Sequence, residues 1–224
     1  MNIGLIYPSR SKAHTYASSI PRLRHFFEHN PYVPAFYHPS LPLLTVAGLT
    51  PDEHGVTLID ERVSDIDFSA DFDIVGITMM TAQARRGYEI ADRFRERDVH
   101  VVLGGIHPTL ETDEARRHAD TLIIGEAENT WLQFLSDFSA GSARREYSER
   151  SVDITRSPVP RYDLIDTDAF YLYPVQTTRG CPFDCCFCSV KAVFGPRYRV
   201  KDTAQVLREL EAVCAVSPDR HCFQ

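Results

Sequence analysis

The chain has 224 residues and a formal net charge of −7, so neither a nucleic acid nor an anionic membrane surface is expected to be its main partner. Its hydrophobic content of 43% suffices for a packed core, and no apolar run is long enough to span a bilayer. The N-terminus lacks the basic start and apolar stretch of a signal peptide. We therefore expect a cytoplasmic protein whose thiols stay reduced.

Short runs rich in valine and isoleucine predict five strands, at residues 2–8, 55–61, 72–80, 99–105 and 120–126. Most of these runs are continuous rather than alternating in polarity, which is typical of strands covered on both faces. Helices are predicted at residues 41–49, 82–97 and 129–138. Strand and helix in succession predict an α/β fold with a doubly wound parallel sheet, in which ligands bind beyond the carboxyl ends of the strands.

The predicted helices have apolar faces. In the second helix the face is formed by Ala84, Tyr88, Ala91 and Phe94, and in the third by Trp131, Leu132, Leu135 and Phe138. Near the end of the chain, residues 202–216 predict another helix, which Asp202 caps with Gln205 three residues on. Its apolar stripe is predicted to contain Val206, Leu207, Leu210, Val213 and Cys214.

Composition divides the chain into three parts. Residues 1–140 form the α/β domain, residues 141–170 are interpreted as a linker, and residues 171–224 hold all six cysteines. The linker interpretation rests on a polar composition and on Pro158 and Pro160, which impose extended geometry. The last part begins with a predicted strand at 173–180, and HCFQ at 221–224 resembles the start of another.

The stretch TRGCPFDCCFCSV, residues 178–190, places four cysteines within eight positions. Cys181, Cys185 and Cys188 can converge on one metal centre, because a short loop is free to curl around it. A structural zinc site uses four protein ligands, whereas three thiolates leave one iron of a four-iron cluster open. Zinc and metal-free thiols remain alternatives. Cys186 is interpreted as a bystander, and Cys214 as a core residue.

This loop resembles CxxxCxΦC, the signature of the radical S-adenosylmethionine (SAM) enzymes, where Φ is aromatic. The resemblance implies a 4Fe-4S cluster on Cys181, Cys185 and Cys188, with SAM on the open iron and Phe187 near the adenine of SAM. It also implies that residues 171–224 begin a partial (β/α) barrel, and that a flavodoxin, ferredoxin or other reductase supplies electrons.

The first domain resembles the flavodoxin-like cobalamin-binding domain that precedes the radical SAM barrel in many anaerobic enzymes. The resemblance rests on three strand ends, GITMMTAQ (76–83), GGIHPT (104–109) and IIGEAEN (123–129). It implies a cobalamin site in which glycines permit close approach and polar residues contact the macrocycle: Gly104, Gly105, Gly125, Thr78, Thr81, His107, Glu126 and Glu128. The alternative is a common Gly-Gly turn and two glutamates that favour the next helix start.

One cobalamin motif is only partly present. Domains of the methionine synthase type carry DxHxxG, whose histidine ligates cobalt, but DEHGVT (52–57) lacks the final glycine and precedes the second strand. His54 is therefore interpreted as a turn residue, and we expect bound cobalamin to lack a histidine from this motif. His107 remains an alternative lower ligand. Methylthiotransferases resemble this layout but place further cluster cysteines in the first domain, and residues 1–180 contain none.

The whole resembles a cobalamin-dependent radical SAM methyltransferase that acts on a small-molecule substrate. The alternatives are the anaerobic oxidative ring cyclase of the same architecture and a non-catalytic cobalamin-binding remnant. Since the chain supplies only the first strand–helix unit of such a barrel and the start of the next, we expect a truncated barrel that releases little 5′-deoxyadenosine. Four cations that follow the loop are interpreted as a solvated face: Lys191, Arg197, Arg199 and Lys201.

Overall fold

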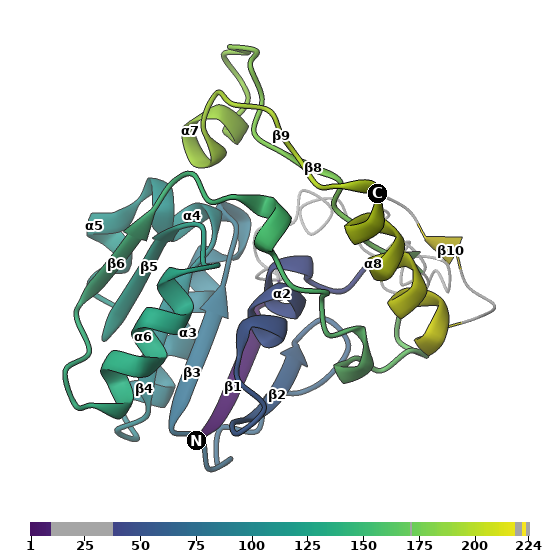
Figure 1. The fold of residues 1–224 in the computed structure, drawn as a ribbon. Helices are drawn as coiled ribbons and strands as arrows, with labels where there is room; N and C mark the ends of the chain where they lie inside the picture. The colour runs from purple at the N-terminus through teal and green to yellow at the C-terminus, as the bar shows by residue number, and fades with distance from the viewer. Residues whose placement is uncertain (10–37, 171, 218–220, 223–224) are drawn as a thin grey trace, which may run out of the picture.

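A six-stranded sheet forms the centre of the computed structural model, which describes residues 1–9, 38–170, 172–217 and 221–222. Its order is β2-β1-β3-β4-β5-β6, and every neighbouring pair is parallel. The strands are β1 (Asn2–Tyr7), β2 (Gly55–Asp60), β3 (Ile74–Thr78), β4 (His100–Gly104), β5 (Thr121–Gly125) and β6 (Glu146–Glu149). The five predicted strands and the parallel α/β class are thus confirmed, and Figure 1 shows their carboxyl ends at the top.

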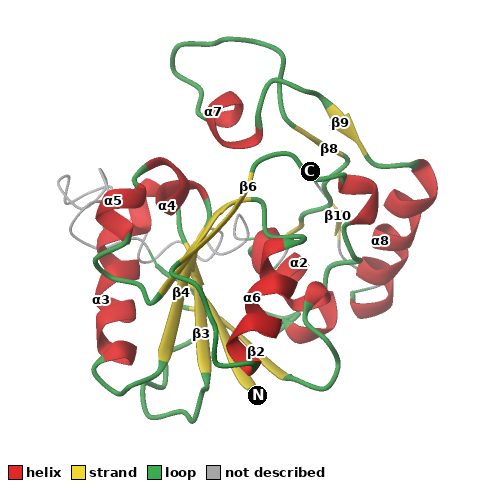
Figure 2. Cartoon of the chain, turned by 60° about the vertical axis from the view of Figure 1, so that its left-hand side comes forward, coloured by secondary structure: helices red, strands yellow, loops and turns green. Residues whose placement is uncertain are grey.

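Helices cover both faces of the sheet, as Figure 2 shows. One face packs against α3 (Ala84–Arg95), and the short helices α4 (Ile106–Leu110) and α5 (Thr112–Ala115) lie on the same side. The other face packs against α2 (Leu41–Leu49) and α6 (Thr130–Ser139). Because β1, β3, β4 and β5 are covered on both faces, their continuous apolar runs are buried almost throughout.

The predicted helix faces are confirmed in α3 and partly wrong in α6. All four predicted residues of the α3 face are buried. In α6, Leu132 is 42% exposed, and Phe134 takes the buried position. Phe134 packs between Trp131 and Tyr147, so the buried stripe of α6 is centred two positions beyond Leu132.

The edge strand β6 comes from the polar stretch that the sequence analysis assigns to the linker. Its sequence EYSE buries one side chain, that of Tyr147, whose hydroxyl donates to Asp137 Oδ2 at 2.8 Å. An edge strand needs only one apolar anchor, and charged neighbours protect its open side. A polar composition therefore concealed a strand.

The second part of the chain consists of short elements. The predicted strand at 173–180 forms only at its two ends, as β7 (Leu172–Tyr173) and β8 (Thr178–Arg179). After the cysteine loop come α7 (Val190–Phe194), β9 (Arg199–Val200), α8 (Thr203–Val216) and β10 (His221–Cys222). The linker before β7 contains two 3-10 turns, η4 (Ile154–Arg156) and η5 (Tyr162–Leu164). β8 pairs antiparallel with β9, and β10 pairs parallel with β7.

The predicted cap of α8 is confirmed, but its predicted stripe is wrong in two positions. Asp202 Oδ1 accepts from the Gln205 amide at 2.7 Å. Leu207 is 53% exposed and Cys214 is exposed, because the buried face carries Gln205 and Glu209 instead. One polar atom of each finds a partner: Lys201 Nζ lies 2.5 Å from Glu209 Oε1, and Gln205 Nε2 donates to two linker carbonyls. Gln205 Oε1 and Glu209 Oε2 are buried without a partner among the described residues.

A third apolar cluster joins the two parts of the chain. Leu44 of α2 packs with Tyr162 of the linker, Tyr173 of β7 and Val213 of α8. Within the described ranges, no helix combines the length and the apolar character that a membrane crossing requires.

Candidate functional site

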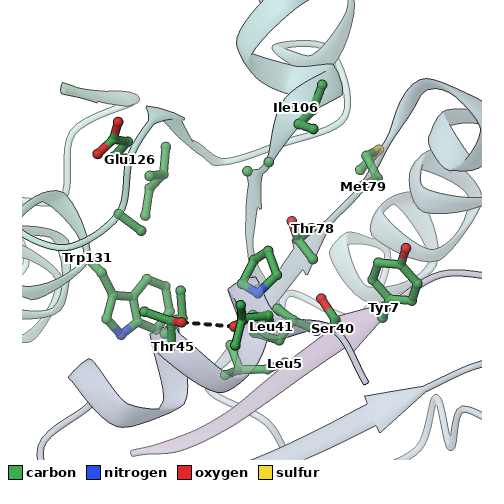
Figure 3. A pocket seen from close by; sticks show the side chains of 18 of the residues that line it. Leu5, Tyr7, Ser40, Leu41, Thr45, Thr78, Met79, Ile106, Glu126 and Trp131 are labelled. Atoms are coloured by element: carbon green, nitrogen blue, oxygen red, sulfur yellow. Dashed lines mark hydrogen bonds between the residues drawn. The ribbon is translucent and has the colours of Figure 1, made fainter. Parts of the chain in front are cut away.

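A cavity of about 320 Å³ lies beyond the carboxyl ends of the strands. Its walls come from β1, β3, β4 and β5, from the start of α2 and from Trp131 of α6, as Figure 3 shows for the labelled side chains. The lining is mainly apolar, with Leu5, Ile77 and Val102 among the residues at its base. This is the crevice in which parallel α/β sheets bind ligands.

The cysteine-bearing part of the chain forms part of the wall of this cavity. Gln176 and Arg179, before the cysteine loop, and Val193 and Phe194 of α7, after it, line the same cavity as the strand ends. Figure 1 shows β8, β9 and α7 above the carboxyl edge of the sheet. One cavity is therefore bounded by both parts of the chain.

Glycines let the backbone form the cavity wall. Gly105 has φ 95° and Gly125 has φ 86°, a region that favours glycine. A Cβ on Gly105 would collide with Thr78 Oγ1, so the ends of β3 and β4 are in close contact. Gly76, within β3, would bring a Cβ to 3.0 Å from Leu5 Cδ2. The predicted cluster of Thr78, Gly104, Gly105 and Gly125 is thus assembled at the cavity.

Ser40, at the start of α2, supplies an unusual polar atom in the wall. It lines the cavity, and its side-chain oxygen is buried without a hydrogen-bond partner among the described residues. The neighbouring Thr45 bonds within its own helix, to Leu41 O at 2.9 Å (Figure 3). Buried polar atoms in folded proteins nearly always have a partner, so the Ser40 hydroxyl is suited to a polar ligand.

Thr81 and His107 do not line the cavity formed by the described residues. His107 is buried on the α3 side, where Nε2 lies 2.9 Å from the Tyr88 hydroxyl and Nδ1 lies 3.3 Å from Thr81 Oγ1. Burial and the nearby Glu114 raise the pKa of Tyr88, which keeps the phenol protonated. His107 therefore serves a hydrogen-bonded network beside the cavity, and the structure gives no support for it as a lower ligand.

Glu126 and Glu128 line the cavity and also bind two arginines of the second part. Arg199 forms a two-pronged contact with Glu126, at 2.5 and 2.7 Å. Arg179 Nη1 reaches Glu126 at 3.1 Å and Glu128 at 2.7 Å, and Ser157 Oγ donates to Glu128 at 2.9 Å. The bond to Glu126 raises the pKa of Arg199. We call these four charged residues the clasp.

The clasp corrects the prediction of a solvated cationic face. Arg199 and Lys201 both have buried acidic partners, Glu126 and Glu209. Lys191 pairs with the exposed Asp184 at 2.9 Å, and Arg197 is exposed, so the prediction is confirmed only for these two cations. Spacing along the sequence could not show which acids would meet the cations, because the partners lie more than 70 residues away for Arg199.

The three predicted ligand cysteines do not line the cavity, and two of them are exposed. Cys181 is half-buried, whereas Cys185, Cys186 and Cys188 are exposed and Phe187 is 88% exposed. In the described part of the chain, no three His, Cys, Asp or Glu side chains are grouped closely enough for a metal ion. The donor set still suits a thiophilic metal centre, since three thiols share one loop between β8 and α7.

The sequence analysis missed three residues of this site. Ser40 and His38 line the cavity from a segment without clear periodicity, and Arg179 directly precedes the Gly180–Cys181 pair. Arg179 was detectable as a charge beside the loop, but its acidic partners were not. His54 is confirmed as a turn residue: its amide donates to Pro51 O, and it lies just before β2, at the edge of the sheet opposite the cavity.

Residues 33–135 match the family model of the B12 binding domain. The chain is 38% identical over 184 residues to bacteriochlorophyllide d C-8(2)-methyltransferase of Chlorobaculum tepidum, a match that covers 78% of this chain and 40% of that protein. It is 26% identical over 173 residues to anaerobic magnesium-protoporphyrin IX monomethyl ester cyclase of Rubrivivax gelatinosus, covering 63% of this chain and 31% of that protein. The chain thus spans two fifths or less of the length of these relatives.

A solved structure extends the likeness to the whole fold. The radical SAM methyltransferase TsrM from Kitasatospora setae, determined with cobalamin and a [4Fe-4S] cluster bound, matches with a TM-score of 0.64 at 17% identity. The match covers 96% of this chain and 47% of that one. The first part of the chain therefore carries a B12-binding domain, and its fold together with that of the following segment resembles this neighbour. Residues 33–135 thus belong to the B12-binding domain family, and the chain shares its fold with a radical SAM methyltransferase.

Proposed function

We propose that this chain is part of a cobalamin-dependent radical SAM methyltransferase that acts on a small molecule. The observation that carries the proposal is the shared cavity: the strand ends of a B12-binding domain form its floor, and the segment around three spaced cysteines forms its roof. A methyl carrier below and a SAM-binding centre above would both reach a substrate between them.

The cavity fits part of a cobalamin. Its apolar walls suit a hydrophobic group, the glycines at 105 and 125 allow the backbone to approach a flat ring, and the Ser40 hydroxyl offers a buried polar contact without a competing partner. Thr78, Gly104, Gly105, Gly125, Glu126 and Glu128 are the predicted contacts that line this cavity. Thr81 and His107 lie outside the lining and support the cavity through α3 and α4.

The cysteine loop fits a cluster by its donor chemistry. Cys181, Cys185 and Cys188 would hold the 4Fe-4S cluster, and Phe187 would shield SAM. When bound, the cluster and SAM supply one-electron reduction and a 5′-deoxyadenosyl radical, and cobalamin supplies a transferable methyl group. A reductase, flavodoxin or ferredoxin would provide the electrons. The chain itself positions these groups and, through the apolar roof residues Val193 and Phe194, limits water access to the cavity.

Two other functions remain in competition. The relationship to the Rubrivivax gelatinosus cyclase favours an oxidative ring cyclase as second candidate. Binding of cobalamin without turnover is the third. All three candidate functions would use the same cavity, so only the reaction that follows cobalamin binding can distinguish them.

The test is anaerobic loading of the protein with iron, sulfide and hydroxocobalamin, followed by SAM with a labelled methyl group. We expect one cobalamin and about four irons per chain, and label in the cobalamin fraction under reducing conditions. An unlabelled cobalamin fraction with SAM cleavage would favour the cyclase. Cobalamin binding without any SAM consumption would indicate the non-catalytic protein, and stoichiometric zinc without sulfide would exclude the proposal.

A further inference from the structure

The clasp connects the two parts of the chain at the point where the cysteine loop begins and ends. Glu126 and Glu128 follow β5 in the first domain, whereas Arg179 and Arg199 lie on β8 and β9 of the second part. Arg179 and Arg199 have side-chain exposures of only 11% and 12%, and Glu126 is fully buried. Two carboxylates and two guanidinium groups balance in charge, so the cluster is neutral.

The acidic half of the clasp stands on a rigid support. The Glu126 amide donates to Glu149 O of β6 at 2.7 Å, and the Gly125 amide donates to Thr109 Oγ1 at 2.9 Å. The carboxylate of Glu126 also accepts from the Val152 amide at 3.3 Å. The backbone at Glu126 is therefore anchored to β6 and α4, independently of the cysteine loop.

The basic half holds both ends of the loop. Arg179 lies two residues before Cys181. Arg199 donates to Glu126 and also to Phe194 O, the last residue of α7, at 2.9 Å, so it fastens the chain just after the loop. Between these points, α7 contacts α4 of the first domain, whereas Cys185 and Cys188 are exposed and the backbone contact of this turn is internal, from the Cys188 amide to Cys185 O at 3.0 Å.

We propose that Glu126 and Glu128 are positioning residues: by binding Arg179 and Arg199 they hold the cysteine loop above the cavity, at a fixed distance from a ligand within it. The inference rests on the proposed function for the identity of that ligand, cobalamin. Two-pronged arginine–carboxylate contacts fix orientation as well as distance, which suits this task. A buried ion pair is weak evidence for added stability, so a role in geometry accounts better for a four-residue cluster.

The chain contains a matched control for the clasp. Lys201 and Glu209 form an ion pair that is as deeply buried, at 2.5 Å, but both residues belong to the second part of the chain. Glu209→Gln removes a buried charge beside β9 without touching the first domain. Glu126→Gln keeps the shape of the side chain and removes the charge that crosses between the parts. Arg179→Gln removes the same contact from β8, outside the six-stranded sheet. An effect shared by Arg179→Gln and Glu126→Gln therefore cannot be due to misfolding of the first domain.

The first experiment is hydrogen exchange on the protein without cofactors. Glu126→Gln and Arg179→Gln are expected to speed exchange of amides in residues 177–201 by at least about tenfold, with the sheet amides unchanged. Glu209→Gln is expected to speed exchange in α8 and to leave residues 178–199 at the wild-type rate. Unchanged exchange in the loop ends of both clasp variants would overturn the proposal.

The second experiment measures the distance that the clasp is proposed to set. In protein loaded with a reduced cluster and cob(II)alamin, pulsed electron paramagnetic resonance reports the dipolar coupling between the two paramagnets. We expect one defined coupling in the wild type and in Glu209→Gln, and a broadened distribution in Arg199→Gln, whose side chain does not line the cavity, at equal iron and cobalamin content. An unchanged distribution would contradict a positioning role. If the wild type bound no cobalamin, the proposed function would fail, and the exchange experiment would still decide whether the clasp holds the loop.

Discussion

The B12-binding domain and the cysteine loop present their functional groups in opposite ways. In the domain the cavity is a product of packing: Phe134, 0% exposed, stands in a core cluster that also contains Leu5 and Trp131 of the cavity wall. In the loop, Phe187 is 88% exposed, and Cys185, Cys186 and Cys188 are exposed as well. The cavity is therefore preformed by the packing of the domain, whereas the cysteine loop would take its final shape only when a metal centre binds.

The largest expected effect is on cluster assembly. Replacing Cys181, Cys185 or Cys188 by alanine should abolish the iron and acid-labile sulfide acquired in anaerobic reconstitution, because three thiolates are the minimum set for the cluster. Cys186→Ala is the matched control on the same loop and should retain the wild-type content. Loss of the cluster in Cys186→Ala, with retention in one of the other three, would show that the ligands are assigned wrongly.

Two phenylalanines, one in each region, test whether the regions differ in packing. Phe134→Ala should lower the free energy of unfolding by about 3–5 kcal/mol, because it leaves a cavity in a buried core. Phe187→Ala should change it by less than about 0.5 kcal/mol, since the ring is exposed. Chemical denaturation of the cofactor-free protein measures both. A cost at Phe187 close to that at Phe134 would mean that the loop is packed in solution.

Backbone shape at the cavity is tested by glycine substitution. Gly105→Ala should cost about 1–3 kcal/mol and weaken cobalamin binding, because φ is 95° and the added Cβ would strike Thr78 Oγ1. Gly141→Ala is the control: its φ is 68°, but a Cβ there would meet nothing within 4 Å. It should cost less and leave cobalamin affinity intact. Equal losses of cobalamin affinity in both variants would show that cobalamin does not bind in this cavity.

The smallest effect concerns pH. Burial lowers the pKa of His100, against an opposing influence of Asp120, so the folded state favours the neutral imidazole. The stability that this residue contributes is present above about pH 6.5 and is lost as the pH falls below it toward the folded pKa. The difference in free energy of unfolding between wild type and His100→Gln should therefore shrink as the pH is lowered from 7.5 to 5, as measured by chemical denaturation. If the wild type instead became more stable relative to His100→Gln as the pH falls, the pKa of His100 would be raised in the folded state, contrary to this prediction.

Much of the fold could be predicted because its determinants are local. The continuous apolar runs gave β1 to β5, and the periodicity of α3 identified its buried face correctly. The edge strand β6 was missed because one tyrosine anchors an otherwise polar segment. In α8 the buried face holds Gln205 and Glu209, whose partners lie far away in sequence or outside the helix, and a hydrophobicity pattern cannot detect such a face.

The candidate site shows the same division. The cysteine spacing and the strand-end glycines are local features, and the glycines do lie at one cavity. The assignment of His107 and Thr81 to the cavity contacts was not supported by the geometry, since their side chains meet beside α3. The clasp depends on contacts across 51 to 73 residues, and only the folded chain brings them together.

Equilibrium titration of hydroxocobalamin into the cofactor-free protein tests the central claim most directly. Gly104 lines the cavity and has ordinary room for a Cβ, 3.4 Å from Ile123 O, so Gly104→Leu should fold and fill the cavity mouth. We predict saturation at one cobalamin per wild-type chain and a loss of affinity of at least about tenfold in Gly104→Leu at an unchanged melting temperature. No binding by the wild type, or equal binding by the stable variant, would contradict the account.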